Sequence, residues 1–526
     1  MIFRSPSPDV KVPEITFPEY VLRKAGQFPD KPAMVDGPSG RTLTYGQLAG
    51  AIKKVAAGLA QRGFGKGDVF AIYSPNLPEY AVIFQAVATV GGINTTINPL
   101  YTVDELANQL NDSAAKYLVT VAPFLDKAKE AAAKSKVEEI FVFGEADGAT
   151  PFATLLDSDG EPPAVKINPK EDLIVLPYSS GTTGLPKGVM LTHYNLVANL
   201  CQMEGMEGFS AMDEKSRVIA VLPYFHIYGM VVIMCYGLAN GSTIVSMPKF
   251  DLEEFLGLLQ KFEITTAPLV PPIVLALAKH PIVDKFNLSS LSLVFSGAAP
   301  LGAALAEEAS KRIGCPLAQG YGMTEASPVT HLTPYSEGKG KPGSAGQVIP
   351  NTEVKIVDLA SGKELGPNEE GELLIRGPQI MKGYLNHPEV TAESIDADGW
   401  YRSGDIGYAD EEGYFFIVDR VKELIKYKGM QVAPAELEAL LLTHPAIMDA
   451  AVIPSPDEEA GEVPKAFVVK KGEVSDAEIM AFVAEKVAPH KRIRLLEFTE
   501  QIPKSASGKI LRRVLIDQER AKKATG

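Results

Sequence analysis

The sequence predicts an α/β protein with a large multi-layer N-terminal domain, which includes a β-rich subdomain, and a small α+β C-terminal domain. The chain has 526 residues, which is more than one hydrophobic core accommodates, so we expect two or more domains. Apolar strand-like runs alternate with longer amphipathic stretches, which is typical of α/β layers. The composition changes after Thr330, where a segment rich in Gly, Lys and Pro leads into shorter strands.

The expected elements follow in chain order. Hydrophobic periodicity predicts helices at 81–90, 230–239 and 250–261, and strands at 116–121, 173–176 and 265–269. Short strands at 353–357 and 372–376 indicate the β-rich subdomain, about residues 335–420. Pro434 opens a further helix that stops before Pro445. We place the domain boundary after residue 420, so that the domains cover 1–420 and 421–526.

Charge and cysteine content restrict the classes of function. Lys plus Arg is 51 and Asp plus Glu is 65, which gives a net charge of −14 and argues against nucleic-acid or anionic-membrane binding. An anionic ligand must therefore be held by locally concentrated basic groups. Cys201, Cys235 and Cys315 have no metal-ligand spacing and fit a reducing compartment. Without a signal-peptide core or a bilayer-spanning apolar run, we expect a cytoplasmic protein with no membrane insertion.

The segment 178–193, YSSGTTGLPKGVMLTH, is the most informative stretch of the chain. It follows a predicted strand and concentrates hydroxyls, glycines and Lys187, whose donors can surround a polyphosphate. It is not the P-loop of common NTPases, because Pro186 precedes the lysine and Gly188 follows it. Taken alone, such a cluster is more often a surface loop. The lysine, the strand and four further segments favour phosphate binding.

Two of these segments are rich in glycine and contain a carboxylate. In 319–325, QGYGMTE, Thr324 can contact a phosphate oxygen and Glu325 can hold Mg²⁺. A turn leading into a capped helix explains this segment equally well. In 399–405, GWYRSGD, Asp405 can accept hydrogen bonds from both hydroxyls of a ribose. An Asp after Gly is also a common turn residue.

The other two segments are basic. Residues 420–428 contain four cations, a pattern that usually marks a solvated face but here lies at the predicted domain boundary of an acidic chain. Lys426 and Lys428 are predicted to share one face of a strand. In 502–513, Lys509 follows Gly508 and can be delivered into a site on the larger domain, although a basic tail is commonly just solvent-exposed.

Together these segments resemble the adenylate-forming superfamily: acyl-CoA synthetases, luciferases and the adenylation domains of peptide synthetases. The resemblance covers nearly the whole chain, in the family's order. Within the superfamily the chain looks like the 4-coumarate–CoA ligases, through residues 1–5, 225–228, 268–276, 296–302 and 424–438. The resemblance implies a mobile C-terminal domain that rotates about a hinge at Lys422 between two steps, a domain alternation.

The implied chemistry is two half-reactions in one site. A substrate carboxylate attacks the α-phosphate of ATP and expels pyrophosphate, and the CoA thiol then attacks the acyl-adenylate and expels AMP. Neither step needs an enzyme nucleophile, so catalysis depends on positioning and charge stabilisation. The resemblance thus implies ATP, Mg²⁺ and CoA, together with a small carboxylic acid. We expect a monomer or weak homo-oligomer.

The resemblance also implies roles for individual residues. Lys509 bridges the substrate carboxylate and the α-phosphate during adenylation, Thr324 lies near that phosphate, Glu325 holds Mg²⁺, and Asp405 and Arg420 hold the ribose. After rotation, Lys426 and Gln431 face the site for thioester formation. The remaining nucleotide contacts are Ser179, Ser180, Gly181, Thr182, Thr183 and Lys187 at the β- and γ-phosphates, with Gln319, Gly320 and Tyr321; those to CoA are Lys249, Lys428 and Gly429.

The same resemblance implies an acyl pocket with His226 as an aromatic gate, although a lone His beside Phe225 and Tyr228 is ordinarily a packed residue. The predicted lining is Tyr228, Ser296, Gly297, Ala298, Gly320, Gly322, Pro328 and Val329. Small residues at 297, 298, 320 and 322 leave room for a flat ring, and Tyr228 can stack on that ring or bond a phenol. Ser327 stands where many plant ligases have Gly, and Thr330-His331 replaces a more apolar stretch beside the expected pocket wall.

The first function predicted is therefore a ligase for 4-coumarate and related cinnamates, as in phenylpropanoid chemistry. A medium-chain fatty acid–CoA ligase is the main alternative, because a few side chains decide which acid such a pocket accepts. A luciferase-like oxygenase and an inactive ATP-binding homologue are less favoured. Lys187, Glu325, Asp405 and Lys509 argue against the inactive homologue, because all four are present.

Overall fold

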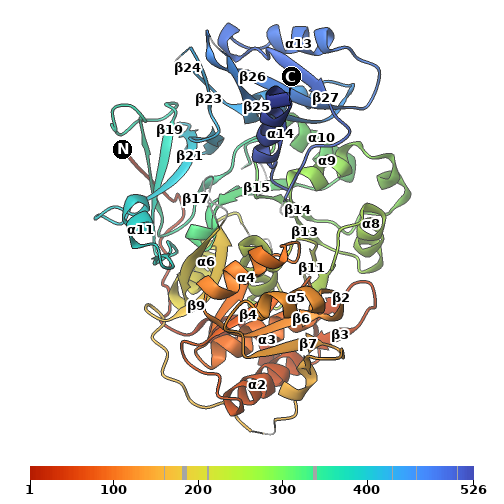
Figure 1. The fold of residues 1–526 in the computed structure, drawn as a ribbon, viewed down its shortest axis with the longest axis vertical. Coiled ribbons are helices and arrows are strands. Elements are labelled where there is room, and N and C mark those ends of the chain that lie inside the picture. Colours follow the sequence, from red (N-terminus) through yellow and green to blue (C-terminus); the bar gives the residue numbers. More distant parts are fainter. Residues whose placement is uncertain are drawn as a thin grey trace.

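The computed structural model describes residues 1–158, 160–179, 186–209, 212–335, 340–428, 430–457, 459–505 and 508–525, with side chains to residue 522. Over these ranges the chain forms four β-sheets with helices on their faces (Figure 1). The predicted α/β class is confirmed. No helix in the described ranges is long and apolar enough to cross a membrane.

Two large, mostly parallel sheets form the bulk of the molecule. Their central strands are apolar runs buried on both faces, such as Val-Phe-Ala-Ile-Tyr at 69–73, which is typical of parallel strands covered by helices. The first sheet runs β20 (Gly383–Tyr384), β10 (Lys187–Thr192), β9 (Leu173–Ser179), β5 (Ile93–Thr96), β4 (Val69–Tyr73), β6 (Ala115–Val121), β7 (Glu139–Phe143) and β8 (Thr150–Pro151). The second runs β17 (Gln347–Val348), β16 (Val329–Leu332), β15 (Leu317–Gly322), β14 (Leu293–Ser296), β13 (Thr266–Leu269), β11 (Arg217–Ala220), β12 (Thr243–Ser246), β2 (Pro32–Asp36) and β3 (Thr42–Thr44).

Two smaller sheets lie beyond them. One is antiparallel and contains β1 (Ile2–Arg4), β18 (Glu353–Val357), β19 (Gly371–Arg376), β21 (Tyr401–Ala409) and β22 (Phe415–Arg420). The other contains β24 (Met430–Val432), β23 (Ile425–Tyr427), β26 (Gly461–Lys470), β25 (Ile447–Asp457) and β27 (Leu495–Phe498) and has an apolar core of its own. The boundary predicted after residue 420 lies between the last strand of one sheet and the first strand of the other.

The helices cover the sheets and are closed by local capping. Thr44 and Gln47 form a capping box at the start of α2, and Pro78 stands in the first turn of α3. The helices are α1 (Phe17–Val21), α2 (Tyr45–Gln61), α3 (Pro78–Thr89), α4 (Val103–Asp112), α5 (Leu125–Ala132), α6 (His193–Gly205), α7 (Tyr236–Ala239), α8 (Leu252–Lys261), α9 (Pro271–Lys279), α10 (Ala303–Ile313), α11 (Pro388–Ser394), α12 (Pro434–Leu441), α13 (Asp476–Ala484) and α14 (Arg512–Thr525).

Most of the predicted elements are confirmed to within a few residues. The predicted helix at 230–239 begins earlier, as a buried π-helix at Tyr228–Cys235 that continues into α7. Lys428 is a correction: β23 ends at Tyr427, and Lys428 lies in the following turn with φ 49°. It therefore shares no strand face with Lys426. The sequence analysis also missed β1, which pairs with β18 and brings the N-terminus into the β-rich sheet.

The C-terminal part lies across the top of the larger body (Figure 1). Its loop before α14 reaches down to the start of α9, where a Cβ added at Gly508 would stand 3.0 Å from Val270 Cγ2. Helix α12 also approaches the segment before α10, because a Cβ at Gly302 would lie 3.6 Å from Ala439 Cβ. Lys509 is therefore held at the junction of the two parts.

Candidate active site

Strands β15, β21 and β22 bring three of the predicted nucleotide residues together. Tyr321 Oη donates to Asp405 Oδ2 at 2.5 Å, and Arg420 Nε lies 3.1 Å from Asp405 Oδ1. Asp405 and Arg420 are register partners in the sheet, which fixes this pair. The Asp405 carboxylate raises the pKa of the Arg420 guanidinium. Both carboxylate oxygens already accept bonds, so ribose hydroxyls must use their remaining lone pairs.

Lys509 enters this site from the far end of the chain. Its pKa is lowered, first by burial and then by Arg420, while Asp405 and Glu325 act in the opposite direction. The Lys509 ammonium is thus within electrostatic range of the groups predicted to hold ribose and metal. A cation here can neutralise charge that develops between a carboxylate and a phosphate.

His226 is also electrostatically coupled to Lys509. Burial, followed by the Lys509 ammonium, lowers the pKa of His226 to about 3. Its Nδ1 accepts from the Tyr228 backbone N–H at 3.3 Å. The preceding Phe225 carbonyl accepts from Thr96 Oγ1 at 2.8 Å, which anchors the segment to β5. The imidazole is thus neutral at physiological pH, which suits a gate and excludes a protonated acid in this arrangement.

The base of the predicted phosphate loop is a β-hairpin. Ser179 ends β9 and is the register partner of Lys187, the first residue of β10. Tyr178 Oη donates to Asp112 Oδ2 at 2.6 Å, which fixes the strand that enters the loop. The predicted contacts Ser180, Gly181, Thr182 and Thr183 lie outside the described residues. The hairpin opens at the carboxyl edge of a parallel sheet, where ligands of α/β folds bind.

Glu325 is suited to hold a metal ion together with a bound nucleotide. Its side chain is buried, and Oε1 accepts from Tyr384 Oη at 3.0 Å. No group of three or more His, Cys, Asp or Glu residues that could hold a metal is found across the described part of the chain. A magnesium ion here must complete its coordination with phosphate oxygens and water, as Mg²⁺ commonly does. The residues present fit a metal that arrives with a nucleotide. Thr324 precedes Glu325 at the start of the same short helix, η6 (Thr324–Ala326).

The predicted acyl pocket is built around Tyr228. Its hydroxyl donates to the carbonyl of Phe295 at 3.2 Å and lies 3.4 Å from that of Leu269. The hydroxyl hydrogen is therefore engaged, and a substrate phenol can only donate to the Tyr228 oxygen. The ring packs edge-on against Phe295, with centroids 6.2 Å apart. Ser296 is 1% exposed, and its Oγ has no partner in the described part of the protein.

The glycines of the predicted pocket also permit close packing within the protein. A Cβ at Gly297 would stand 3.1 Å from the Tyr228 ring, one at Gly320 2.5 Å from Phe295 Cζ, and one at Gly322 2.1 Å from the Pro328 carbonyl. On these sides the protein itself fills the space, so the glycines permit close packing of the pocket walls. Ala298 adopts φ 72°, a left-handed conformation, and Val329 is buried in the main core.

Thr330 and His331, predicted beside the pocket wall, are fully buried. The His331 ring lies between Tyr321 and Phe415, at centroid distances of 5.5 and 4.4 Å. Burial lowers the pKa of His331 to about 3, and its Nδ1 is 2.9 Å from Thr330 Oγ1. His331 thus packs between Tyr321, which is predicted to contact the nucleotide, and Phe415 of the β-rich sheet.

The residues predicted for CoA and thioester formation are not gathered with the others. Lys426 and Gln431 are exposed register partners in the β23–β24 hairpin, at the outer end of the C-terminal sheet (Figure 1). Lys428 and the predicted hinge Lys422 are exposed, as is Lys249 after β12. Gly429 lies outside the described residues. The structure therefore assembles the residues assigned to adenylation and leaves the others in solvent.

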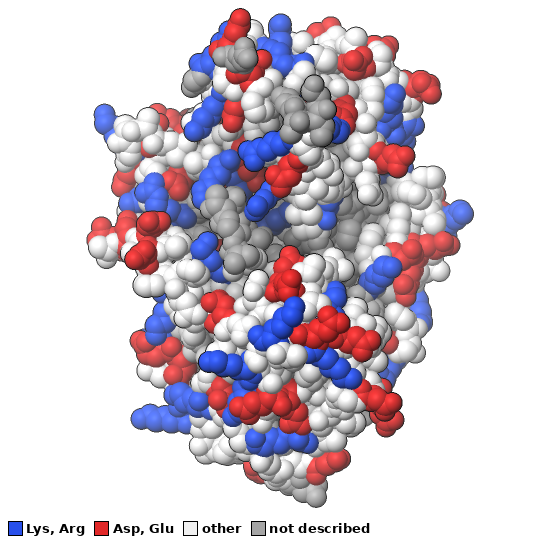
Figure 2. Space-filling model, in the orientation of Figure 1, with Lys and Arg blue, Asp and Glu red and all other residues white. Residues whose placement is uncertain are grey.

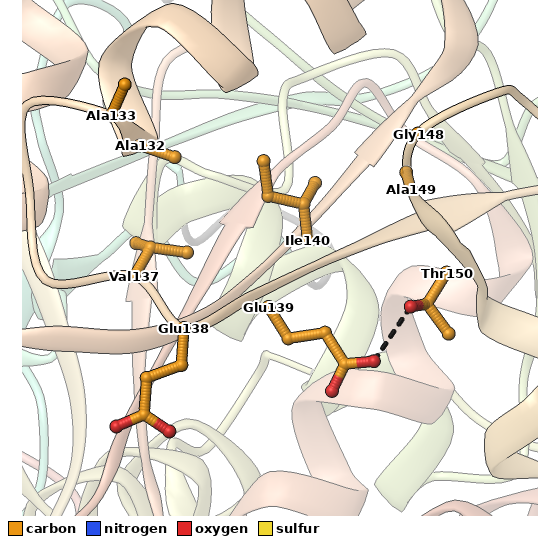
Figure 3. A pocket seen from close by; sticks show the side chains of 9 residues that line it. All are labelled: Ala132, Ala133, Val137, Glu138, Glu139, Ile140, Gly148, Ala149 and Thr150. Atoms are coloured by element: carbon orange, nitrogen blue, oxygen red, sulfur yellow. Dashed lines mark hydrogen bonds between the residues drawn. The ribbon is translucent and has the colours of Figure 1, made fainter.

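The charge distribution agrees with this location. In Figure 2, Lys and Arg side chains gather around the hollow between the C-terminal part and the larger body, within a surface of mixed charge. A separate groove of about 580 Å³ lies at the edge strands β7 and β8. There Glu139 accepts a hydrogen bond from Thr150 at 2.7 Å (Figure 3), and Glu138 adds a second carboxylate. This groove lies toward the opposite end of the sheet from β9 and β10, which carry the predicted phosphate loop.

Comparison with protein families decides the classification. The family described as AMP-binding enzyme matches residues 21–385, and the AMP-binding enzyme C-terminal domain matches residues 436–509. The chain belongs to the AMP-binding enzyme family. The predicted membership of the adenylate-forming superfamily is confirmed.

Relatives of this AMP-binding enzyme are similar to it over nearly their full lengths. It is 46% identical to 4-coumarate--CoA ligase 1 of Petroselinum crispum, covering 100% of this chain and 97% of the relative. It is 43% identical to the 4-coumarate--CoA ligase of Pinus taeda, covering 99% and 98%. Among solved structures it resembles the anthranilate CoA ligase AuaEII in complex with anthranoyl-AMP, with a TM-score of 0.88, 27% identity and 97% and 98% coverage. ATP-bound MatB from Rhodopseudomonas palustris gives a TM-score of 0.85 at 28% identity, covering 96% and 99%.

Sequence reasoning missed two residues of this AMP-binding enzyme site. Tyr384 donates a hydrogen bond to Glu325, and the Glu423 charge partly opposes the lowering of the Lys509 pKa. The local sequence around Tyr384, Lys-Gly-Tyr-Leu, contains no motif that points to a metal carboxylate. Glu423 lies inside the basic segment 420–428, where only the cations drew attention.

Proposed function

We propose that this chain is an ATP-dependent acid–CoA ligase that activates a hydroxycinnamate-type acid, 4-coumarate or an analogue. The observation that carries the proposal is the position of Lys509 beside Arg420, Asp405, Glu325 and His226. These electrostatic couplings support a role for Lys509 in offsetting the repulsion between a carboxylate and an α-phosphate. The full-length similarity to 4-coumarate--CoA ligases supports the choice of acid. We keep the cytoplasm as the proposed compartment.

In the first half-reaction, a carboxylate oxygen of the acid bonds to the α-phosphorus of ATP as the bond to the bridging oxygen breaks. Pyrophosphate leaves, and the product is an acyl-adenylate. Lys509 offsets the repulsion between carboxylate and phosphate, while Asp405 and Arg420 orient the ribose. Glu325 would hold Mg²⁺, which supplies charge neutralisation for the departing pyrophosphate. The hairpin that begins at Ser179 and Lys187 would restrain the same group.

In the second half-reaction, the CoA sulfur bonds to the acyl carbon, the thiol proton is released, and AMP leaves with the carboxyl oxygen. We propose that the C-terminal part rotates about Lys422 between the two steps. The rotation would withdraw Lys509 and bring Lys426 and Gln431 to the site. Lys249, Lys428 and Gly429 would then contact CoA. The exposure of Lys426 and Gln431 in the present arrangement supports this order of events.

The proposal is tested with a panel of cinnamic, benzoic and C6–C12 fatty acids. We expect acid-dependent ATP–pyrophosphate exchange and acyl-CoA formation, with the highest kcat/KM for 4-coumarate or a close analogue. A tenfold preference for octanoate over 4-coumarate, about 1.4 kcal/mol in the transition state, would assign the chain to fatty acids instead. Absence of exchange with every acid would make it an inactive nucleotide-binding homologue.

A further inference from the structure

Tyr384 occupies a position next to Glu325 that the activity alone does not explain. Its hydroxyl donates to Glu325 Oε1 at 3.0 Å, and the Glu325 backbone carbonyl accepts from Met381 N at 2.8 Å. Both contacts come from one short segment around β20. The segment thus holds Glu325 by its backbone and by its carboxylate.

The same segment is paired with the strand that leaves the phosphate loop. In β20, Gly383 and Tyr384 are the register partners of Met190 and Val189 in β10. Beyond it, Leu385 N donates to the Gly188 carbonyl at 2.8 Å. Since β10 begins at Lys187, β20 connects the loop lysine and the predicted metal carboxylate through one continuous piece of backbone.

A second tyrosine lies near the first. Tyr401 of β21 is buried, and its side chain interacts with that of Tyr384 and with the Glu325 charge. The Tyr384 hydroxyl therefore has a tyrosine neighbour from another strand in addition to its bond to Glu325.

We propose that Tyr384 is a positioning residue for the metal site: its bond to Glu325 Oε1 would leave the other carboxylate oxygen available to the metal that accompanies ATP. This inference rests on the proposed function. A single carboxylate has few constraints on its own orientation, and no cluster of three ligating side chains occurs in the part of the chain that is described. Hydrogen bonds to ligating carboxylates commonly alter metal affinity tenfold or more. Without the hydrogen bond from Tyr384, Glu325 would therefore bind the metal more weakly.

The test variant is Tyr384→Phe, which removes only the hydroxyl. The control is Tyr117→Phe, because Tyr117 Oη donates to the Arg62 carbonyl at 2.7 Å in β6, away from the site. Tyr401→Phe serves as a second variant that leaves the bond to Glu325 in place. Thermal unfolding of all variants establishes that each is folded.

The primary measurement is the affinity for Mn²⁺ in the presence of α,β-methylene ATP, monitored by electron paramagnetic resonance. For Tyr384→Phe we expect Mn²⁺ affinity to fall about tenfold, with a smaller loss for Tyr401→Phe and none for Tyr117→Phe. The Mg²⁺ concentration for half-maximal ATP–pyrophosphate exchange should rise by the same factor. Acyl-CoA formation from a supplied acyl-adenylate should be unchanged, because that step contains no pyrophosphate.

Unchanged Mn²⁺ affinity, within twofold, in Tyr384→Phe overturns the inference whatever the activity does. An equal loss of both half-reactions with normal Mn²⁺ affinity also overturns it, since that result indicates a merely structural contact. Failure of the proposed function looks different: the wild-type enzyme then shows no acid-dependent exchange, while the Mn²⁺ titration still reports on Tyr384.

Discussion

Replacing Gly508 with Ala should impair adenylation selectively. Gly508 has φ 78° and directly precedes Lys509. An alanine there adopts a left-handed conformation at a cost of about 1–2 kcal/mol. Its Cβ would also stand 3.0 Å from Val270 Cγ2 and 3.3 Å from Pro272 Cδ. Crowding of this kind costs about 1–3 kcal/mol more.

The two costs fall on different states. Backbone strain is present wherever the loop keeps its shape, whereas in the proposed rotation the contacts with Val270 and Pro272 would exist only while Lys509 is docked. The docked state should therefore lose about 1–3 kcal/mol relative to the rotated one, which corresponds to a decrease of roughly 5- to 150-fold in adenylation rate. Acyl-CoA formation from a supplied acyl-adenylate should stay close to the wild-type rate.

The assay compares ATP–pyrophosphate exchange with thioester formation from the adenylate. Gly40→Ala is the matched control, since Gly40 has φ 74°, lies in the turn between β2 and β3, and has no atom within 4 Å of an added Cβ. It should lose stability and leave both half-reactions unchanged. Exchange within twofold of wild type in Gly508→Ala, or equal losses in both half-reactions, would refute the reasoning.

Two further predictions concern stability. Burial raises the pKa of Glu438 from 4.5 to about 7, against the opposing effect of Arg512. Between these values the folded carboxyl keeps a proton that the unfolded chain releases, so the free energy of unfolding should fall as pH rises from 4.5 to 7, by up to about 3 kcal/mol. Denaturation at several pH values should show this slope for wild type and lose it in Glu438→Gln; an identical slope in the variant would contradict the assignment. Gly320→Ala should lower the unfolding temperature, because its Cβ would stand 2.5 Å from Phe295 Cζ and such overpacking costs about 1–3 kcal/mol. It should also raise KM for the acid, because the added methyl group would displace Phe295 against Tyr228. The control is Gly26→Ala, where an added Cβ has no atom within 4 Å. If calorimetry gave both variants the same unfolding temperature, the prediction would be wrong.

Local patterns were sufficient for much of the fold. The apolar run at 173–176 lies in β9 and the stretch at 250–261 corresponds to α8, which begins at Leu252 after the capping residue Asp251. Such elements depend on periodicity and capping within a few residues. Strand β1 was missed because three residues at a chain end give no periodic signal. Lys428 was misplaced because the turn after Tyr427 adopts a positive φ that a period-two pattern does not indicate.

The candidate site divides in the same way. Its motifs predicted the residue types that handle a polyphosphate and a ribose, and the structure places Tyr321, Asp405 and Arg420 in one bonded group. Tyr384 was not predicted, because its partner Glu325 is 59 residues away and the two residues belong to different elements. The glycines at 297, 320 and 322 were predicted to leave room for substrate, and only the structure shows that a Cβ at each would also meet packed protein atoms.

By itself, the sequence determined the α/β class, the family and the set of polar residues available for acyl-adenylate chemistry, because these depend on local spacing and residue type. The tertiary structure alone decided which of them lie close together. It placed Lys509 beside His226 and Asp405 and left Lys426 in solvent. It also engaged the Tyr228 hydroxyl with backbone carbonyls. The physical reason is that contacts between distant segments depend on how sheets and helices pack, and no local pattern encodes that arrangement.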